Sequence, residues 1–142
     1  MLYSTGTIHY DDTDGHRITL LVDQGLANYY RSLIPKTERV IKPRWDAHIT
    51  VVRPEYEIPP KIRYWGDYEG LKVEFPYDPY LLNGNGYYWI NVWSLRLEAI
   101  RTELGLENYS KYPLLPKGYN KTFHITVGKY EEIFPMGEAP EK

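Results

Sequence analysis

The 142-residue sequence contains no cysteine, which excludes disulfides, thiolate metal sites and a cysteine nucleophile. No apolar run approaches the length of a membrane-spanning helix, and the first residues have neither the basic region nor the apolar segment of a secretory signal. A basic surplus is also missing, because 17 Lys and Arg residues stand against 19 Asp and Glu residues. We therefore expect a cytoplasmic protein that binds neither membranes nor long nucleic-acid duplexes.

Two common catalytic signatures are absent as well. The sequence has no Gly-x-Ser-x-Gly segment, which would carry the nucleophile of an α/β-hydrolase, and no His-x-His or His-Glu-x-x-His spacing of a zinc site. These absences argue against acyl transfer and against a metal centre. We expect the protein to use no metal and no cofactor.

Aromatic residues, in contrast, are plentiful: 15 Tyr, 4 Trp and 3 Phe. Flat side chains pack in cores, and they also serve as platforms on which nucleic-acid bases stack. Tyr10 lies at the start of a turn-forming segment, and Trp65 lies in a middle region rich in Gly and Pro. We select both as candidates for binding a base, with packing inside the fold as the alternative.

The most informative feature is the motif His-Ile-Thr-Val, which occurs at residues 48–51 and again at residues 124–127. Ile, Thr and Val favour extended backbone, so both copies predict a strand. Alternate side chains of a strand point to opposite faces, so His and Thr share one face while Ile and Val point into a core. Each copy thus presents an imidazole, which exchanges protons near neutral pH, beside a hydroxyl, which holds an oxygen without changing charge. Two such pairs would supply a general base, a general acid and two oxygen anchors.

This pair of motifs resembles the 2H phosphoesterases, a family defined by two His-x-Thr/Ser motifs on the central strands of two pseudo-symmetric lobes. The resemblance covers both motifs, their separation of 76 residues and the short chain. It implies that His48, Thr50, His124 and Thr126 form the catalytic set. Within the family the chain looks closest to the small phage-encoded branch, which includes the anti-CBASS nucleases that open cyclic oligonucleotide immune signals. That branch would act in the host cytoplasm.

The segment before the first motif predicts a hairpin followed by a helix. Residues 4–10 and 17–22 read as strands joined by the turn-forming run at 11–15. A helix is predicted to begin after Asp23, which is a good N-cap, and to end before Pro35.

The segment before the second motif has the same order of elements. A turn at residues 83–86 leads into a predicted strand at 87–93, which pairs with the segment near 80–82. Ser94 then caps a second predicted helix, which ends at Gly105.

The order strand, helix, motif strand therefore occurs twice, although no residue-level repeat is evident outside the motif itself. Together with the resemblance, this order implies an α+β fold of the 2H phosphoesterase type. We expect one domain over residues 1–142, with antiparallel sheets flanked by helices. Its two pseudo-symmetric lobes would face a central cleft, with one motif from each lobe.

The remaining polar candidates are less specific. The other two histidines, His9 and His16, have no Thr two residues further on, and we expect them to be structural or solvated. Five basic residues near the motifs are candidates for neutralising a phosphate, with ordinary surface charge as the alternative: Lys42, Arg44, Arg53, Lys121 and Lys129.

Two imidazoles on one site suit acid-base catalysis at phosphorus without a metal. One takes a proton from a ribose 2'-hydroxyl or a water, the other gives a proton to the leaving oxygen, and the two hydroxyls donate to the non-bridging oxygens. A motif this symmetric does not identify which histidine is the base.

The preferred hypothesis is a metal-independent phosphodiesterase that cleaves 3'-5' bonds of small cyclic oligonucleotides, as the resemblance implies. Two alternatives stay open. One is a 2',3'-cyclic phosphodiesterase that acts on RNA ends, and the other is a module that binds a nucleotide without cleaving it.

Overall fold

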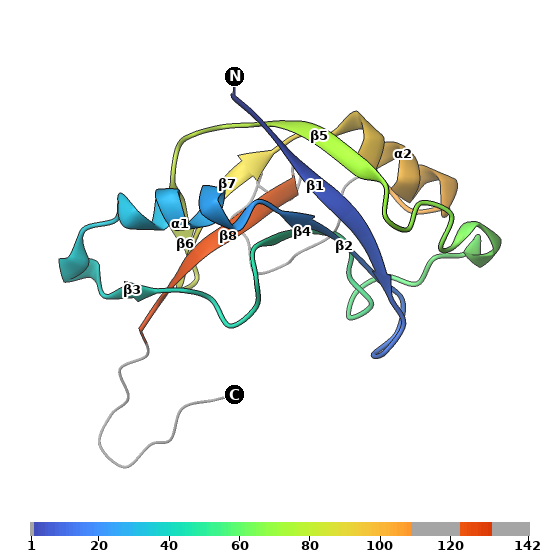
Figure 1. Cartoon of the computed structure of the whole chain (residues 1–142). Coiled ribbons are helices and arrows are strands. Elements are labelled where there is room, and N and C mark those ends of the chain that lie inside the picture. The colour runs from blue at the N-terminus through green and yellow to red at the C-terminus, as the bar shows by residue number, and fades with distance from the viewer. Residues whose placement is uncertain (1, 109–122, 132–142) are drawn as a thin grey trace, which may run out of the picture.

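The computed structural model describes residues 2–108 and 123–131, which form an α+β fold with two helices and one sheet. The eight described strands lie in the order β3-β8-β4-β2-β1-β5-β7-β6, and every pairing is antiparallel. Strand β8 also pairs with β7, so the pairings β8-β4-β2-β1-β5-β7 close a ring (Figure 1). The strands are β1 (Leu2–Asp11), β2 (Arg17–Val22), β3 (Val40–Ile41), β4 (His48–Val52), β5 (Lys72–Tyr77), β6 (Leu82–Gly84), β7 (Tyr87–Val92) and β8 (Phe123–Tyr130).

The hairpin and the helix predicted before the first motif are both confirmed. Strands β1 and β2 pair from Gly6 opposite Val22 to the turn. Helix α1 (Gln24–Ser32) begins after Asp23, whose carboxylate accepts a 2.9 Å hydrogen bond from the Gly25 N–H. This bond satisfies one of the N–H groups that lack a partner inside a helix, which explains why the helix begins there.

The elements predicted before the second motif are confirmed as well. Helix α2 (Leu95–Glu103) begins after Ser94, whose hydroxyl accepts a 3.1 Å hydrogen bond from the Leu97 N–H, and Gly105 follows with φ of 86°. Strands β6 and β7 form a hairpin through Asn85 and Gly86, whose φ values of 52° and 87° fit a type I′ turn. Strand β6 begins two residues later in the chain than the predicted partner segment at 80–82.

One face of the sheet carries the core. A row of fully buried apolar side chains crosses five strands in register: Ile8, Leu20, Ile49, Ile125 and Ile90. Both helices add side chains to the same cluster: Ala27 and Tyr30 from α1, and Leu97 and Ile100 from α2. Because strand side chains alternate, the residues next to this row point to the opposite face of the sheet. We call that opposite face, which carries the His and Thr of both motifs, the motif face.

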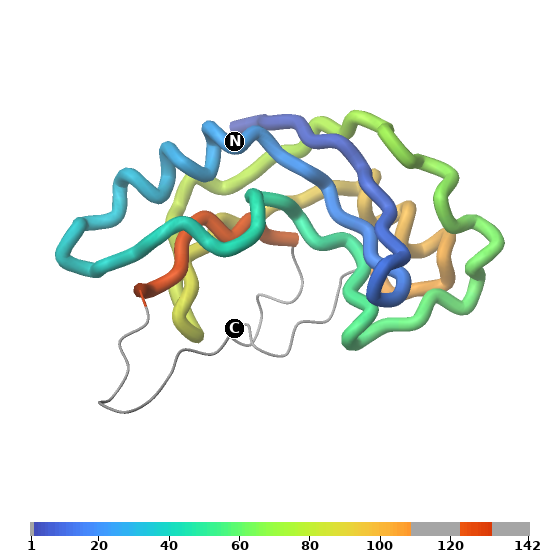
Figure 2. The backbone as a smooth tube through the Cα atoms, turned by 60° about the horizontal axis from the view of Figure 1, so that its bottom comes forward, coloured from blue at the N-terminus to red at the C-terminus, as the bar shows by residue number. Residues whose placement is uncertain are grey.

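The two halves of the chain are joined more closely than we expected. The sequence predicted two lobes facing a central cleft, and in the structure strands from both halves belong to one sheet, with β4 and β8 as neighbours (Figures 1 and 2). Pairing these strands buries Ile49 and Ile125 in a common core, which gives the arrangement its physical reason.

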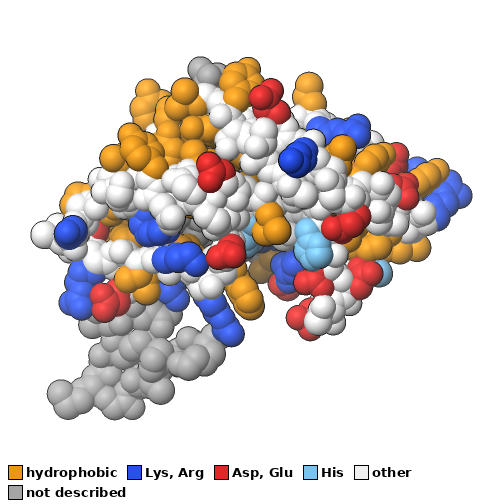
Figure 3. All heavy atoms as spheres, in the orientation of Figure 1, with side chains coloured by type: hydrophobic (Ala, Val, Ile, Leu, Met, Phe, Trp, Pro, Cys, Tyr) orange, Lys and Arg blue, Asp and Glu red, His pale blue; other side chains and the backbone are white. Residues whose placement is uncertain are grey.

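The surface shows where apolar side chains remain outside the core. They gather over α1 and the N-terminal end of β1 (Figure 3), where the exposed apolar residues include Leu2, Tyr3, Tyr29 and Leu33. Charged side chains of both signs are interspersed over the rest of this view, in keeping with a net charge of -2.

Candidate active site

The two motifs meet at the pairing of β4 with β8. Ile49 lies opposite Ile125, so in an antiparallel ladder His48 comes opposite Thr126 and Thr50 comes opposite His124. All four side chains therefore share the motif face as a two-by-two group. The histidines occupy one diagonal of this group, where neighbouring residues are typically roughly 7–8 Å apart and their Cβ atoms somewhat closer. That spacing leaves room for one phosphodiester group between the two imidazoles.

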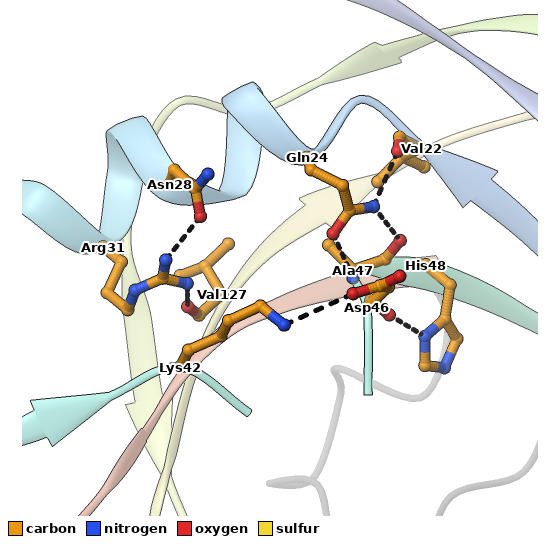
Figure 4. A network of polar contacts seen from close by, with 9 residues as sticks. All are labelled: Val22, Gln24, Asn28, Arg31, Lys42, Asp46, Ala47, His48 and Val127. Carbon is orange, nitrogen blue, oxygen red and sulfur yellow. Dashed lines mark hydrogen bonds and ion pairs between the residues drawn. The ribbon is translucent and has the colours of Figure 1, made fainter. Parts of the chain in front are cut away.

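His48 is half-buried, and its ring is held from the backbone. Its Nδ1 lies 2.7 Å from the Asp46 carbonyl oxygen, and because a carbonyl only accepts, Nδ1 must donate (Figure 4). Nε2 is therefore the nitrogen that exchanges a proton. The neighbouring Ala47 is fixed by the Gln24 side chain, which accepts from the Ala47 N–H at 2.8 Å and donates to its carbonyl at 2.9 Å.

The two imidazoles have different electrostatic surroundings. Desolvation, then the charge of Arg53 and then that of His48 lower the pKa of His124 from 6.5 to about 3. Desolvation also lowers the pKa of His48, with Arg53 and Arg17 acting in the same direction, but the hydrogen bond to the Asp46 carbonyl opposes them. His124 is thus the imidazole that more strongly prefers to be neutral.

Both motif strands contain a β-bulge at the same motif position. The β2–β4 register shifts so that Val51 is an extra residue, and the β7–β8 register shifts so that Val127 is an extra residue. An extra residue reverses the alternation after it. Arg53 therefore comes onto the motif face after the first motif, and Lys129 comes onto it after the second.

The repeat is consequently longer than the motif that we recognised in the sequence. It reads His-Ile-Thr-Val-x-Arg at residues 48–53 and His-Ile-Thr-Val-x-Lys at residues 124–129. Sequence reasoning selected Arg53 and Lys129 only as neighbouring cations. Their equal spacing from the histidines is visible in the sequence, but strict alternation without a bulge would place both on the core face. The bulges bring both to the motif face.

Further residues of this face come from the strands on either side. Thr19 on β2 lies opposite Thr50, and His9 on β1 lies opposite Thr19, so this histidine shares the motif face. His9 is exposed, and its ring Nδ1 lies 3.3 Å from Glu69.

On the other side, β7 places Asn91 opposite His124 and Trp89 opposite Thr126, and the Trp89 indole donates to the Asn91 side chain at 3.1 Å. Both β7 residues are buried. Sequence reasoning missed them because their role depends on which strand pairs with β8.

Tyr10 and Trp65 contact each other away from the four motif residues. Their ring centroids are 5.0 Å apart, and the Trp65 indole donates to Asp12 at 2.8 Å. Tyr10 lies opposite Ile18 and thus faces the core, where desolvation raises its pKa to about 12. His16 also packs against Trp65, with 4.8 Å between ring centroids. The role of both aromatic residues in binding a base stays a prediction.

Two of the other predicted cations have local partners. Lys42 Nζ lies 3.3 Å from an Asp46 carboxylate oxygen, and the Arg44 guanidinium lies 5.0 Å from the centroid of the Trp45 ring. Lys121 lies outside the described residues.

Residues 2–108 and 123–131 contain no group of three or more His, Asp, Glu or Cys side chains arranged to hold a metal ion. No helix within these ranges is long and apolar enough to cross a membrane. Comparisons of the chain with family models, with curated proteins and with solved structures give no match. The interpretation of this site therefore depends on the geometry and chemistry of its own residues.

Proposed function

We propose that the protein is a metal-independent phosphodiesterase that cleaves 3'-5' bonds of small cyclic oligonucleotides, on a fold of the two-lobed 2H phosphoesterase type. One observation carries the proposal: the Ile49–Ile125 pairing puts two imidazoles and two hydroxyls on one face in a two-by-two group. A paired proton donor and acceptor, with oxygen anchors between them, is what in-line displacement at phosphorus needs.

The surroundings of the histidines favour distinct roles. His124, whose pKa is lowered to about 3, is neutral at physiological pH and acts as the general base on a ribose 2'-hydroxyl or a water. His48 acts as the general acid, because its Nδ1–H bond to the Asp46 carbonyl favours the protonated ring. Its Nε2–H gives the proton to the leaving oxygen. The negative charge of a bound phosphodiester raises the pKa of His48 and so supports this role.

The polar neighbours stabilise charge on the phosphorus oxygens. The hydroxyls of Thr50 and Thr126 donate to the non-bridging oxygens as negative charge grows on them. Arg53 and Lys129, which come after the two motifs on the same face, offset the charge of the phosphates. Each half of the site thus contributes one imidazole, one hydroxyl and one cation.

The few cations near the site favour a small substrate. A ligand with two phosphates matches Arg53 and Lys129, whereas a long RNA would need a wider basic surface than a net charge of -2 supplies. An RNA-end 2',3'-cyclic phosphate offers the same chemistry with one phosphate, and it is the second candidate. Binding without cleavage is disfavoured, since two imidazoles suited to proton transfer add nothing to simple capture of a nucleotide.

The test is a substrate panel with the purified protein in EDTA: cyclic dinucleotides, cyclic trinucleotides and 2',3'-cyclic mononucleotides, with products separated by chromatography. We expect the protein to cleave a cyclic di- or trinucleotide, and we expect this activity to persist in EDTA. His48→Ala and His124→Ala should each reduce turnover by at least about 100-fold while the circular dichroism spectrum is retained. Turnover within tenfold of the parent in either variant, or activity that EDTA abolishes and a divalent ion restores, would contradict the proposal.

A further inference from the structure

The bulges in the two motif strands create the same backbone problem at equivalent places. An extra residue interrupts the ladder of hydrogen bonds, so the carbonyl groups near it lose the regular partners of a sheet. Val51 and Val127, the two extra residues, are completely buried, so water does not replace those partners. A buried carbonyl without a donor is strongly unfavourable, and each bulge therefore needs a donor from elsewhere.

An arginine from a helix supplies the donor in both cases. Arg31 Nη1 donates to the Val127 carbonyl at 2.9 Å (Figure 4), and Arg101 Nη1 donates to the Val51 carbonyl at 2.7 Å. Each arginine lies in the last turn of a nine-residue helix, α1 or α2. The two contacts are thus equivalent in donor, acceptor and place in the fold.

The contacts cross from one half of the chain to the other. Helix α1 precedes the first motif in the sequence, but its arginine holds β8, which carries His124. Helix α2 precedes the second motif, but its arginine holds β4, which carries His48. Each motif strand is therefore fixed by the helix of the other half.

Neighbouring groups hold both guanidinium groups in place. Arg31 Nη2 donates to the side chain of Asn28, one turn earlier in α1. Arg101 forms a buried ion pair with Glu57, and Glu57 Oε1 in turn accepts from the Arg53 N–H at 3.2 Å. Arg101 thus contacts the bulge of β4 directly, and it is linked to the backbone of Arg53 through Glu57.

We propose that Arg31 and Arg101 are a matched pair of positioning residues, each of which orients the His-x-Thr pair of the strand that it contacts through the carbonyl of a bulge valine. Both arginines lie on the core side of the strands, so neither touches a substrate on the motif face. The effect on catalysis rests on the proposed function, whereas the effect on the orientation of the imidazoles does not. A displacement of about 1 Å at a reacting group can cost about 100-fold in rate.

The first test replaces Arg31 by Met, which keeps most of the apolar length and removes the donor. We expect kcat to fall at least about tenfold, with KM within about twofold because substrate contacts are unchanged. Arg31→Lys, which retains a charged donor, should recover part of kcat. Arg96→Met is the matched control, because Arg96 lies on α2, is exposed and faces the Tyr68 ring instead of a motif strand. It should change neither constant.

The decisive readout is the nuclear magnetic resonance of the two imidazoles in the folded variants. Arg31→Met should shift the ring resonances of His124 at least about twofold more than those of His48. For the other arginine, Arg101→Met is combined with Glu57→Gln, so that no buried carboxylate loses its ion-pair partner. This double variant should show the opposite pattern, with His48 shifted more than His124. General loosening of the fold would shift both rings in both variants and would not produce the crossed pattern.

The outcomes separate this inference from the proposed function. Equal shifts of the two rings in each variant, or shifts no larger than in Arg96→Met, would overturn the positioning role. A crossed pattern in a protein that cleaves none of the tested phosphodiesters would support the positioning role and remove the proposed function. If kcat falls only in proportion to the unfolded fraction and the crossed pattern is missing, both arginines stabilise the fold without orienting the histidines.

Discussion

His48 and His124 occupy equivalent places in a repeated motif, yet their protons are held differently. A backbone carbonyl fixes the Nδ1–H of His48, whereas burial, Arg53 and His48 together disfavour a charge on His124. The asymmetry arises from residues outside the tetrapeptides, because Asp46 lies two residues before the first histidine and Arg53 lies five residues after it. In the proposed mechanism, the two identical tetrapeptides therefore take opposite roles, one as the general base and one as the general acid.

The pH dependence of kcat/KM reports the free protein and should reflect these pKa shifts. The base must be neutral, so activity falls as the pH drops through the pKa of His124, about 3. The acid must be protonated, so activity also falls as the pH rises through the pKa of His48, which lies below 6.5. We expect a bell-shaped profile with its maximum on the acidic side of neutrality. Initial rates from pH 3 to 9 test this, and a flat profile or a maximum above pH 7 would contradict it.

The assignment of roles can be tested with the leaving group. A nitrophenyl phosphodiester of a nucleotide releases an anion that needs no proton, so the general acid matters less for it. The factor by which His48→Ala lowers turnover should therefore be about tenfold smaller for this substrate than for a cyclic dinucleotide. His124→Ala should lose a similar factor on both. The reverse ranking of the two variants would exchange the roles of the histidines.

At the scale of the element, a single extra residue in each motif strand determines which side chains the motif face contains. Without the bulges, strict alternation would turn Arg53 and Lys129 toward the core, where a charge is costly. With the bulges, Val51 and Val127 are the extra residues at which the alternation changes, and both stay buried. The bulged strand also needs room beside it, and Gly128 provides that room next to β3.

Gly128→Ala should destabilise the protein, because a Cβ there would lie 2.5 Å from Val40 Cγ1. Forcing this contact in a packed region costs about 1–3 kcal/mol. Val40→Ala removes the opposing methyl groups, so the double variant should be more stable than the sum of the two single changes predicts. Urea unfolding of the four proteins measures the coupling. Strictly additive effects would show that this contact does not restrict the bulge.

At the scale of the whole molecule, the two motifs meet where β4 from the first half pairs with β8 from the second half. Hydrogen bonds from α1 and α2 also join one half to the other, and further pairings between the halves link β3 with β8 and β1 with β5. Neither half has a separate core, since the row of buried isoleucine and leucine side chains runs through both. Folding therefore desolvates both motif histidines together.

This shared desolvation should make stability depend on pH in mild acid. The pKa of His124 falls from 6.5 to about 3 on folding, and that of His48 is lowered too, so only the unfolded chain takes up these protons as the pH falls below 6.5. As far as these two groups determine it, the free energy of unfolding has its full value above pH 6.5 and decreases as the pH falls below 6.5. His124→Gln should reduce the loss of melting temperature between pH 7 and pH 5, whatever its effect at pH 7. An unchanged loss would show that His124 does not titrate differently in the folded protein.

The amino-acid sequence alone determines the local elements and the inner and outer faces of most strands. Asp23 and Ser94 predict where both helices begin, Asn85-Gly86 predicts a hairpin turn, and the alternation in each motif predicts buried isoleucines beside outward histidines. These features depend on neighbouring residues, through capping, turn geometry and the two-residue period of a strand.

Only the tertiary structure decides which motif residues meet and which groups hold them. The pairing of Ile49 with Ile125 joins strands 76 residues apart, and nothing in either tetrapeptide specifies that register. The bulges, the crossed bonds from Arg31 and Arg101, and the position of Tyr10 on the core face likewise depend on long-range packing. Their physical reason is common to all of them: burying apolar side chains from both halves in one core leaves backbone groups and charges that only distant parts of the chain can satisfy.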